Sequence, residues 1–477
     1  MPRQTTRRRA WTGVAFVTAI AAVAGGAWGM QRWAPFADEV EAPSWPDNVA
    51  PLIDYVEDAT GQHFVEHVAI EYIDREADYV ARVQAEPLEP TAADRTVMST
   101  DEAVGRALGL WGGATSITAV HRALDGANPI PVTWLAAENT IVINAAGESS
   151  KLSPLIRAEL TVRLTQALDD QLFHTFGRIQ EAPTSQEYQA LVAISVGHAV
   201  WVHDLYIADL SDDDIDEYTA ASEESSANWA DATAEIPVSY QAIRSVGQQI
   251  GPAFIEALSE QGRTLVARAL SSDAPVALDQ VSLPAGKFLR RDPLEAATAP
   301  PGPASADVQY TNQMGPFATY LLFSTGLPLH VALTASDGWG NDRYTAYTLD
   351  GRVCVDVHLV ADSRDDADRL ANGLNGWARA RPDQADALVG RSGNDLYATA
   401  CDPGTDVEQT VPTDAAVQQY VARAQELQFR ADLSGDAELA ECVTVGFFGT
   451  YDIDELDDSF DYVSEFDNIE QDCLASA

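Results

Sequence analysis

Basic residues are scarce in this chain. Its 477 residues include 29 lysines and arginines against 73 aspartates and glutamates, which gives a formal net charge of −44. Only Lys151 and Lys287 are lysines. A surface this acidic repels nucleic acid and anionic lipid headgroups, so we expect no nucleic-acid partner. The balance favours adaptation to high salt, where screening removes the self-repulsion of the carboxylates, over recognition of a specific cationic partner.

Several catalytic motifs are absent. The sequence contains no GxSxG, no phosphate-binding loop and no GxGxxG followed by a suitable acid. Among eight histidines only His63 and His67 are spaced as HxxxH, and with Glu66 they fit the inverted zinc pattern HxxEH. Phe64–Ile73 alternates like a strand, however, and residues four apart in a strand lie about 13 Å from each other. We therefore expect surface or core histidines here and not zinc ligands.

Cysteine is also rare, and all four cysteines lie in the last third of the chain. None is paired as CxxC, which argues against a zinc or redox site made of cysteines. An even number suggests disulfides, and three pairings are possible. Proximity in the sequence favours Cys354–Cys401 and Cys442–Cys473.

The N-terminus has the pattern of a membrane anchor. Four arginines within residues 3–9 precede an uncharged run from Ala10 to Met30. About 20 apolar residues span a bilayer, and flanking basic residues favour the cytoplasmic side. We expect a single-pass protein of the cell membrane, with a cytoplasmic N-terminus, the lipid bilayer around this helix and the bulk of the chain extracytoplasmic. A cleaved signal peptide is the alternative.

The remaining chain is apolar enough to fold, since hydrophobic residues make up 46% of it. We predict the α+β class and four divisions. These are a basic tip and anchor (1–36), a main domain (37–295), a small α+β unit (296–410), and a helix with an acidic, disulfide-stapled tail (411–477). A Pro- and Ala-rich linker, residues 295–305, separates the second division from the third.

Two helices dominate the predicted main domain. Residues 154–173 contain no Gly and no internal Pro, and their apolar residues recur at helical spacing. Ser153 is expected to cap this helix, with Pro154 in its first position. A second helix is predicted over 187–205.

The other expected elements are shorter. Residues 131–135 and 139–143 predict a hairpin with a turn between them. The acidic run 210–218 lacks the spacing of a calcium loop, so we expect a solvated loop there. Residues 239–270 predict two helices broken at Gly251–Pro252.

The first of the two long helices carries a family resemblance. Val162–Phe173, VRLTQALDDQLF, resembles the active helix HELTHALQDQHF of bacterial and archaeal membrane-anchored, zincin-like metallopeptidases of the gluzincin type. There, two histidines bind Zn²⁺ and the glutamate between them activates water. Here the histidine positions hold Val162 and Gln166, and the glutamate position holds Arg163. The family's third ligand, a glutamate in an EGDA-like segment, matches Val196.

Three further segments resemble the same family. PVALDQVSLPAGKFLRRDP, residues 275–293, is similar to P-x-x-T-E-Q-V-L-H-P-E-K-Y, with Leu283 at the histidine position. Ala335–Tyr347 resembles AxGWGGDRY. The strand 139–143 resembles the family's edge strand, which positions substrate by strand addition. The resemblance implies a gluzincin-like scaffold: a mixed sheet, an active helix and a mostly helical second half.

The changed positions remove the chemistry that the resemblance would imply. We expect zinc to be absent, and we expect an inactive pseudoenzyme that binds a peptide or protein partner or serves envelope structure. The alternative is an active metal-dependent peptidase with unconventional ligands. His174 and His198, or His63 and His67, would then be its ligands. His203 lies five residues after His198, which puts it off the same helix face.

Overall fold

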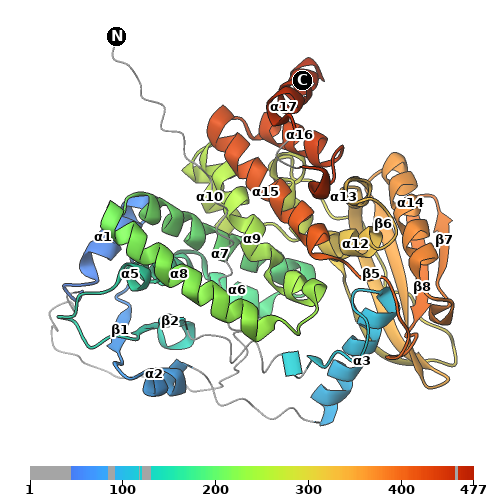
Figure 1. The fold of residues 1–477 in the computed structure, drawn as a ribbon, viewed down its shortest axis with the longest axis horizontal. Coiled ribbons are helices and arrows are strands. Elements are labelled where there is room, and N and C mark those ends of the chain that lie inside the picture. The colour runs from blue at the N-terminus through green and yellow to red at the C-terminus, as the bar shows by residue number, and fades with distance from the viewer. Residues whose placement is uncertain (1–44, 84–91, 118, 121–129, 457–459, 477) are drawn as a thin grey trace.

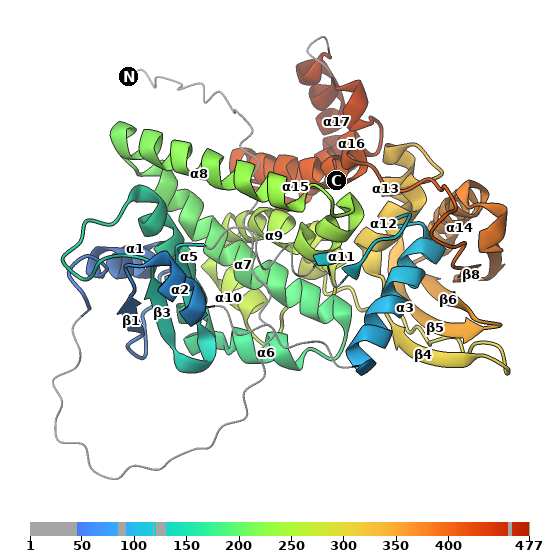
Figure 2. The same cartoon turned by 60° about the horizontal axis from the view of Figure 1, so that its bottom comes forward.

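The computed structural model describes residues 45–83, 92–117, 119–120, 130–456 and 460–476. The expected membrane anchor, residues 10–30, lies outside the described residues. The fold combines many helices with two sheets, which confirms the α+β class. A body of helices lies between the two sheets in both views (Figures 1 and 2).

The first sheet has three short strands in the order β1-β3-β2. Their bounds are Ala69–Tyr72 (β1), Val132–Leu135 (β2) and Thr140–Ile143 (β3). The hairpin of β2 and β3, joined by a 3₁₀ turn η1 (Ala136–Glu138), is confirmed. β1 pairs in parallel with the other side of β3, so β3 is the central strand and the expectation of an edge strand at 139–143 is wrong.

The predicted strand over 64–73 is also too long, because β1 begins at Ala69. Side chains hold the preceding segment instead of a strand partner. Gln171 accepts from the backbone N–H groups of Val65 and Glu66, and Glu57 accepts from that of Phe64. These contacts fix an irregular segment where alternation alone predicts a strand.

The helices that pack beside this sheet are confirmed in part. α5 spans Pro154–Phe173, the predicted range, and the Ser153 hydroxyl accepts from the Ile156 N–H at its start. The predicted second helix is α7, Ser185–Ala208. The neighbouring helices are α1 (Ala50–Thr60), α2 (Glu76–Val83), α3 (Ala92–Leu108), α6 (Thr175–Glu181), α8 (Asp212–Thr233), α9 (Val238–Ser259) and α10 (Arg263–Leu270).

One helix satisfies the length and composition of a membrane span within the residues described. It is α7, and most of it is buried. It packs between α5 and α9, in the core of the helical body.

Two expectations for the helical body are wrong. The acidic run is the start of α8, not a loop: Ser211 caps it, and Asp212, Asp213 and Asp214 occupy its first turn, where the helix dipole favours carboxylates. α9 runs through Gly251 and Pro252 without a break. A Cβ at Gly251 would lie 2.1 Å from the Ala193 carbonyl oxygen of α7, so this glycine permits a close helix crossing.

The second sheet is antiparallel, with the strand order β4-β5-β6-β8-β7. Its strands are Asp307–Asn312 (β4), Trp339–Leu349 (β5), Arg352–Ala361 (β6), Leu388–Ser392 (β7) and Asp395–Cys401 (β8). Helices α12 (Gly315–Ser324), α13 (Leu329–Ser336) and α14 (Arg364–Ala380) accompany it. These helices and strands confirm that the region 296–410 contains both helices and strands, as the sequence predicts.

A segment from the N-terminal half completes the core around this sheet. α3 and α14 both contact β6 and β8. The indole of Trp377 donates to the Leu108 carbonyl, and Arg106 pairs with Asp402 at 2.7 Å. One hydrophobic cluster therefore runs from α3 through α7 and α9 to the second sheet, while a separate cluster joins α1, α5 and the first sheet.

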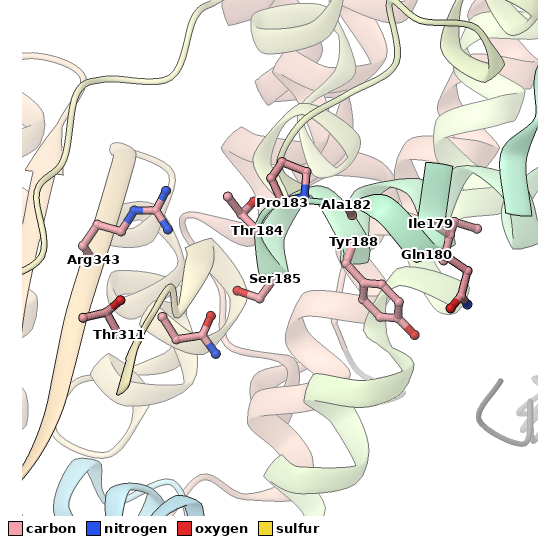
Figure 3. Close-up of a pocket in the computed structure, with 10 residues that line it drawn as sticks. Ile179, Gln180, Ala182, Pro183, Thr184, Ser185, Tyr188, Thr311 and Arg343 are labelled. Atoms are coloured by element: carbon pink, nitrogen blue, oxygen red, sulfur yellow. The ribbon is translucent and has the colours of Figure 1, made fainter. Parts of the chain in front are cut away.

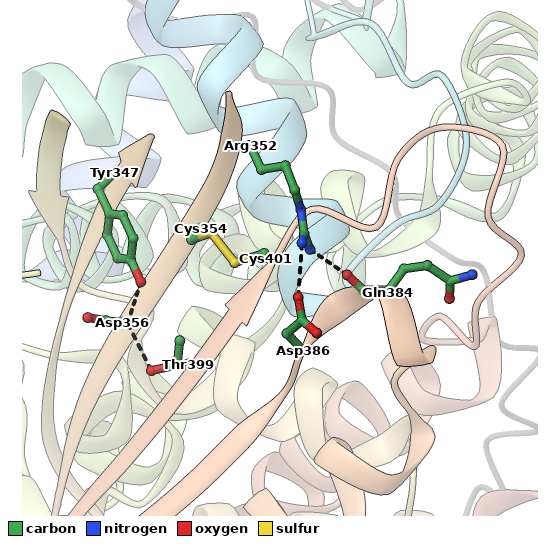
Figure 4. Close-up of a disulfide and its surroundings, with 8 residues drawn as sticks. All are labelled: Tyr347, Arg352, Cys354, Asp356, Gln384, Asp386, Thr399 and Cys401. Carbon is green, nitrogen blue, oxygen red and sulfur yellow. Dashed lines mark hydrogen bonds and ion pairs between the residues drawn. A yellow bond between two sulfur atoms is a disulfide. The ribbon is translucent and has the colours of Figure 1, made fainter. Parts of the chain in front are cut away.

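Both disulfides have the pairing that sequence proximity favours. Cys354 and Cys401 are directly opposite each other on β6 and β8 (Figure 4), where Tyr347 and Thr399 also donate to Asp356. Cys442–Cys473 joins α16 to α17. The tail therefore docks through α15 (Asp414–Ser434), α16 (Ala437–Phe448) and α17 (Tyr462–Ser476).

The remaining short helices are α11 (Leu278–Ser282), η2 (Pro284–Leu289, a π-helix), η3 (Asp383–Ala385) and η4 (Ile453–Glu455).

Candidate functional site

The motif positions of α5 and α7 are filled by packed side chains. Val162 on α5 and Val196 on α7 each expose only 5% of their surface. The two helices pack against each other. An aliphatic side chain has no lone pair to offer a metal ion, so these two positions contribute core and no ligand.

Arg163 occupies the glutamate position and is fully engaged. Its Nε donates to the Val132 carbonyl of β2 at 3.2 Å. One Nη donates to Gln166 Oε1 at 3.0 Å, and the other pairs with Glu159 Oε2 at 3.4 Å. The guanidinium group and the Glu159 carboxylate are both buried. Arg163 therefore ties α5 to the edge strand β2 and holds the amide at the second histidine position.

Tyr79 of α2 lies beside Arg163 and β2. It is 0% exposed, and its hydroxyl donates to the Ile130 carbonyl at 2.5 Å and lies 2.8 Å from Thr133 Oγ1. Burial raises the pKa of Tyr79 to about 12, although the charge of Arg163 opposes the shift. A neutral phenol, an engaged arginine and aliphatic packing leave no general base at the motif position.

His198, two residues beyond the third-ligand position, forms a buried pair with Asp169 of α5. The Nδ1–Oδ2 distance is 2.8 Å, and the side chains expose 5% and 2% of their surface. Burial raises the pKa of Asp169, and the proximity of His198 opposes that rise. Among the described residues His198 has no hydrogen bond to a hydroxyl or thiol, so the pair lacks the nucleophile of a Ser–His–Asp arrangement.

The other candidate histidines point to separate partners. His174 is exposed and ends α5 with φ of 53°. His203 lies beside Asp204 and Tyr218. His63 contacts Glu57, and the ring of His67 stacks on Trp45 with centroids 4.0 Å apart. His63 and His67 lie in the irregular segment before β1, which is neither the predicted strand nor the helix that zinc binding would need.

Carboxylates and histidines gather closely enough to share an ion at one place in the described chain. This group is Glu256, Glu260 and Asp432, which contains no histidine and is largely exposed. Glu256 also accepts a hydrogen bond from the Trp201 indole at 2.6 Å. Exposed carboxylate groups are common in so acidic a chain, and this group carries no argument for a metal.

The segment 275–293 serves the fold through a second buried ionic cluster. Lys287 Nζ lies 3.7 Å from Asp279 and 2.9 Å from Asp292, and it also contacts Asp362 at the end of β6. Burial raises the pKa of Asp279 to about 7 and that of Asp362 to about 6. Burial lowers the pKa of Lys287, but the three carboxylates outweigh it and raise that pKa above its usual value. Gln280 adds bonds to the backbone of Val276 and Asp292.

The segment 335–347 also serves the fold, through the buried carboxylate of Asp342. Asp342 is 0% exposed and accepts from the N–H groups of Met314 and Gly315 and from the Trp339 indole. It thereby anchors the start of α12 to β5. Burial raises the pKa of Asp342, and these three donors oppose the rise.

The comparisons add no relative to this picture. No protein-family model, no curated protein and no solved structure matches the chain. The sequence motif located the four changed positions, but it did not reveal the partners of Arg163. The spacing of Glu159 and Arg163, four residues apart on a helix, is the signal that indicates this pair.

Proposed function

We propose that this chain is a membrane-anchored, extracytoplasmic, metallopeptidase-like protein that is catalytically inactive. The proposal assigns it a zincin-like scaffold in which the former site has become a buried packing and hydrogen-bonding junction. The observation that carries the proposal is the engagement of Arg163 with Val132, Gln166 and Glu159 at the position of the general base. The two disulfides fit an oxidising compartment.

The residues at the motif positions do not fit zinc. A catalytic zinc site uses three protein ligands from His, Cys or carboxylate side chains. Val162 and Val196 offer none, and the amide oxygen of Gln166 is held by Arg163. A buried guanidinium would also repel a divalent cation. Without a metal, nothing at these positions lowers the pKa of an attacking water molecule.

The same features favour one non-catalytic role at this place over the other. Strand addition needs a free strand edge, and β3 has a partner on both sides. The buried Val162 and Val196 favour a structural part for the former site over peptide binding in it. A peptide or protein partner would therefore not pair with β3 or enter the space filled by Val162 and Val196.

Zinc content of the purified full-length protein tests the proposal. We expect a zinc-to-chain ratio near zero by mass spectrometry after dialysis against trace zinc, and no chelator-sensitive cleavage of a peptide mixture. A ratio approaching one would overturn the proposal. Single alanine substitutions of His198, His174 and His67 would then find the ligands.

A restored variant tests the scaffold assignment separately. It combines Val162→His, Arg163→Glu, Gln166→His and Val196→Glu, and its matched control omits only Val196→Glu. If the scaffold is zincin-like, the folded four-residue variant should take up one zinc per chain and the control much less. Failure of a folded restored variant to bind zinc would contradict the zincin-like geometry.

A further inference from the structure

A polar pocket lies away from the motif helix, between the α6–α7 connection and the edge of the second sheet. It encloses about 530 Å³, within the roughly 300–1,000 Å³ typical of small-molecule sites. Figure 3 shows its two sides, one from the segment around Thr184 and Tyr188, the other from β4 and β5. The lining residues are Ile179, Gln180, Ala182, Pro183, Thr184, Ser185, Tyr188, Thr311, Asn312 and Arg343.

Arg343 is the only charged residue of this lining. It is half-buried, and within the described ranges no hydrogen bond or ion pair engages its guanidinium group. Other arginines of the described chain are engaged: Arg106 and Arg423 each hold an aspartate, and Arg381 donates to Gln409 and the Thr410 carbonyl. A half-buried arginine without a carboxylate partner does not stabilise the fold by pairing, so its charge is available to a ligand.

The neighbouring carboxylate, Asp342, is not a hydrogen-bonding or ion-pair partner of Arg343. The charge of Arg343 acts on the pKa of Asp342, but the oxygens of Asp342 accept from Met314, Gly315 and Trp339. Successive strand residues point to opposite faces, which separates the Asp342 anchor from the pocket. The alternation of β5 therefore leaves Arg343 facing the pocket wall formed by Thr184 and Ser185.

The rest of the pocket supplies neutral polar groups. Hydroxyls of Thr311 and Tyr188 and the amides of Asn312 and Gln180 line it. Its far wall is the start of α7, whose dipole favours a negative charge. Glu187 in the first turn of α7 acts against this effect, but it also interacts with the charge of Arg178 on α6.

We propose that this pocket binds the carboxylate group of a small ligand through Arg343. A guanidinium fork matches the two oxygens of a carboxylate, and one cation balances one negative charge. A phosphate monoester carries about −1.5 to −2 at neutral pH, which a single arginine does not balance in so acidic a protein. The carboxylate can belong to a small organic acid or to the free C-terminus of a peptide. This site is independent of the proposed inactive motif.

Calorimetric titration of the purified full-length protein at low salt tests the proposal. The probes are N-acetyl-trialanine, its C-terminal amide, glutarate and phenyl phosphate. We expect a free carboxylate to bind at least about tenfold more tightly than the amide. Binding of N-acetyl-trialanine identifies a peptide C-terminus as the source, and binding of glutarate alone identifies a small acid.

The matched variants are Arg343→Gln and Arg379→Gln, which remove the same charge. Arg379 is an exposed residue at the end of α14 and lies outside the pocket. Arg343→Gln should weaken carboxylate binding at least about tenfold, and Arg379→Gln should leave it unchanged. Arg343→Lys keeps the charge but not the fork, so it should weaken binding less than Arg343→Gln does. Equal binding of acid and amide, tighter binding of phenyl phosphate, unchanged binding by a folded Arg343→Gln variant, or no binding of any probe would overturn the proposal.

Discussion

Two ionic clusters of this protein, around Arg163 and around Lys287, differ in their charge balance. At the motif helix, Arg163 faces one carboxylate, Glu159, and two neutral acceptors. At the 275–293 segment, Lys287 faces three carboxylates. The first cluster is neutral and the second carries an excess of negative charge when all its groups are ionised. In the second cluster, burial raises the pKa of Asp279 to about 7 and that of Asp362 to about 6.

The comparison separates what each region does for the fold. The Arg163 cluster joins α5 to the edge of the first sheet, inside one hydrophobic cluster. The Lys287 cluster joins the turns after α10 to the end of β6 in the second sheet. The Arg163 cluster, which we propose lies at a former active site, has balanced charge. The Lys287 cluster, which we call the clamp, has more carboxylates than cations. Loss of the cation should therefore cost more at the clamp.

Lys287→Met should give the largest effect. It leaves Asp279, Asp292 and Asp362 close together without a cation, and breaking a buried pair in this way costs about 3–5 kcal/mol. Urea unfolding near neutral pH measures the loss. The other lysine of the chain, Lys151, is exposed, and Lys151→Met is the matched control with little expected change. Equal effects of the two substitutions would contradict the clamp.

Arg163→Met should cost less, about 2–3 kcal/mol in the free energy of unfolding. It strands one buried carboxylate, Glu159, and one backbone acceptor, the Val132 carbonyl. The double variant Arg163→Met/Glu159→Met should recover part of the loss, because it removes the unpaired charge as well. A double variant less stable than the single variant would show that the pair does not act as a unit.

The sequence predicted the local features of these regions better than the long-range ones. The range of α5 and its Ser153 cap follow from apolar spacing and cap chemistry, and both are confirmed. The close crossing of α9 and α7 at Gly251 joins residues far apart in the sequence, and no local pattern reveals it. β7 is a short and mostly exposed strand, so no alternation of buried and exposed residues marks it in the sequence.

The candidate site divides in the same way. The resemblance singled out Val162, Arg163 and Gln166 on α5 and Val196 on α7, because motif matching depends only on spacing along the chain. The bond from Arg163 to Val132 joins residues 31 positions apart, and that between His198 and Asp169 joins residues 29 positions apart. The pocket around Arg343 combines β4, β5 and the α6–α7 connection. Contacts of this kind depend on the packed fold.

The charge imbalance around Lys287 predicts that the stability of the protein depends on pH. The pKa values of Asp279 and Asp362 are raised in the folded protein to about 7 and about 6. Folding therefore favours the protonated form of these two carboxyl groups. Their contribution to the free energy of unfolding is fully present below the pKa of an unfolded aspartate, near pH 4, and is lost as the pH rises through 6 and 7.

Asp279→Asn should therefore flatten the fall in stability between pH 5 and pH 8 by at least about 1 kcal/mol, since one pKa unit corresponds to about 1.4 kcal/mol. Unfolding at constant ionic strength measures the slope, because repulsion among the other carboxylates changes with salt. Arg163→Met supplies the comparison: it should lower stability and leave the slope that depends on Asp279 in place. A wild-type slope retained in Asp279→Asn would place the pH sensitivity in the general surface charge instead of the clamp.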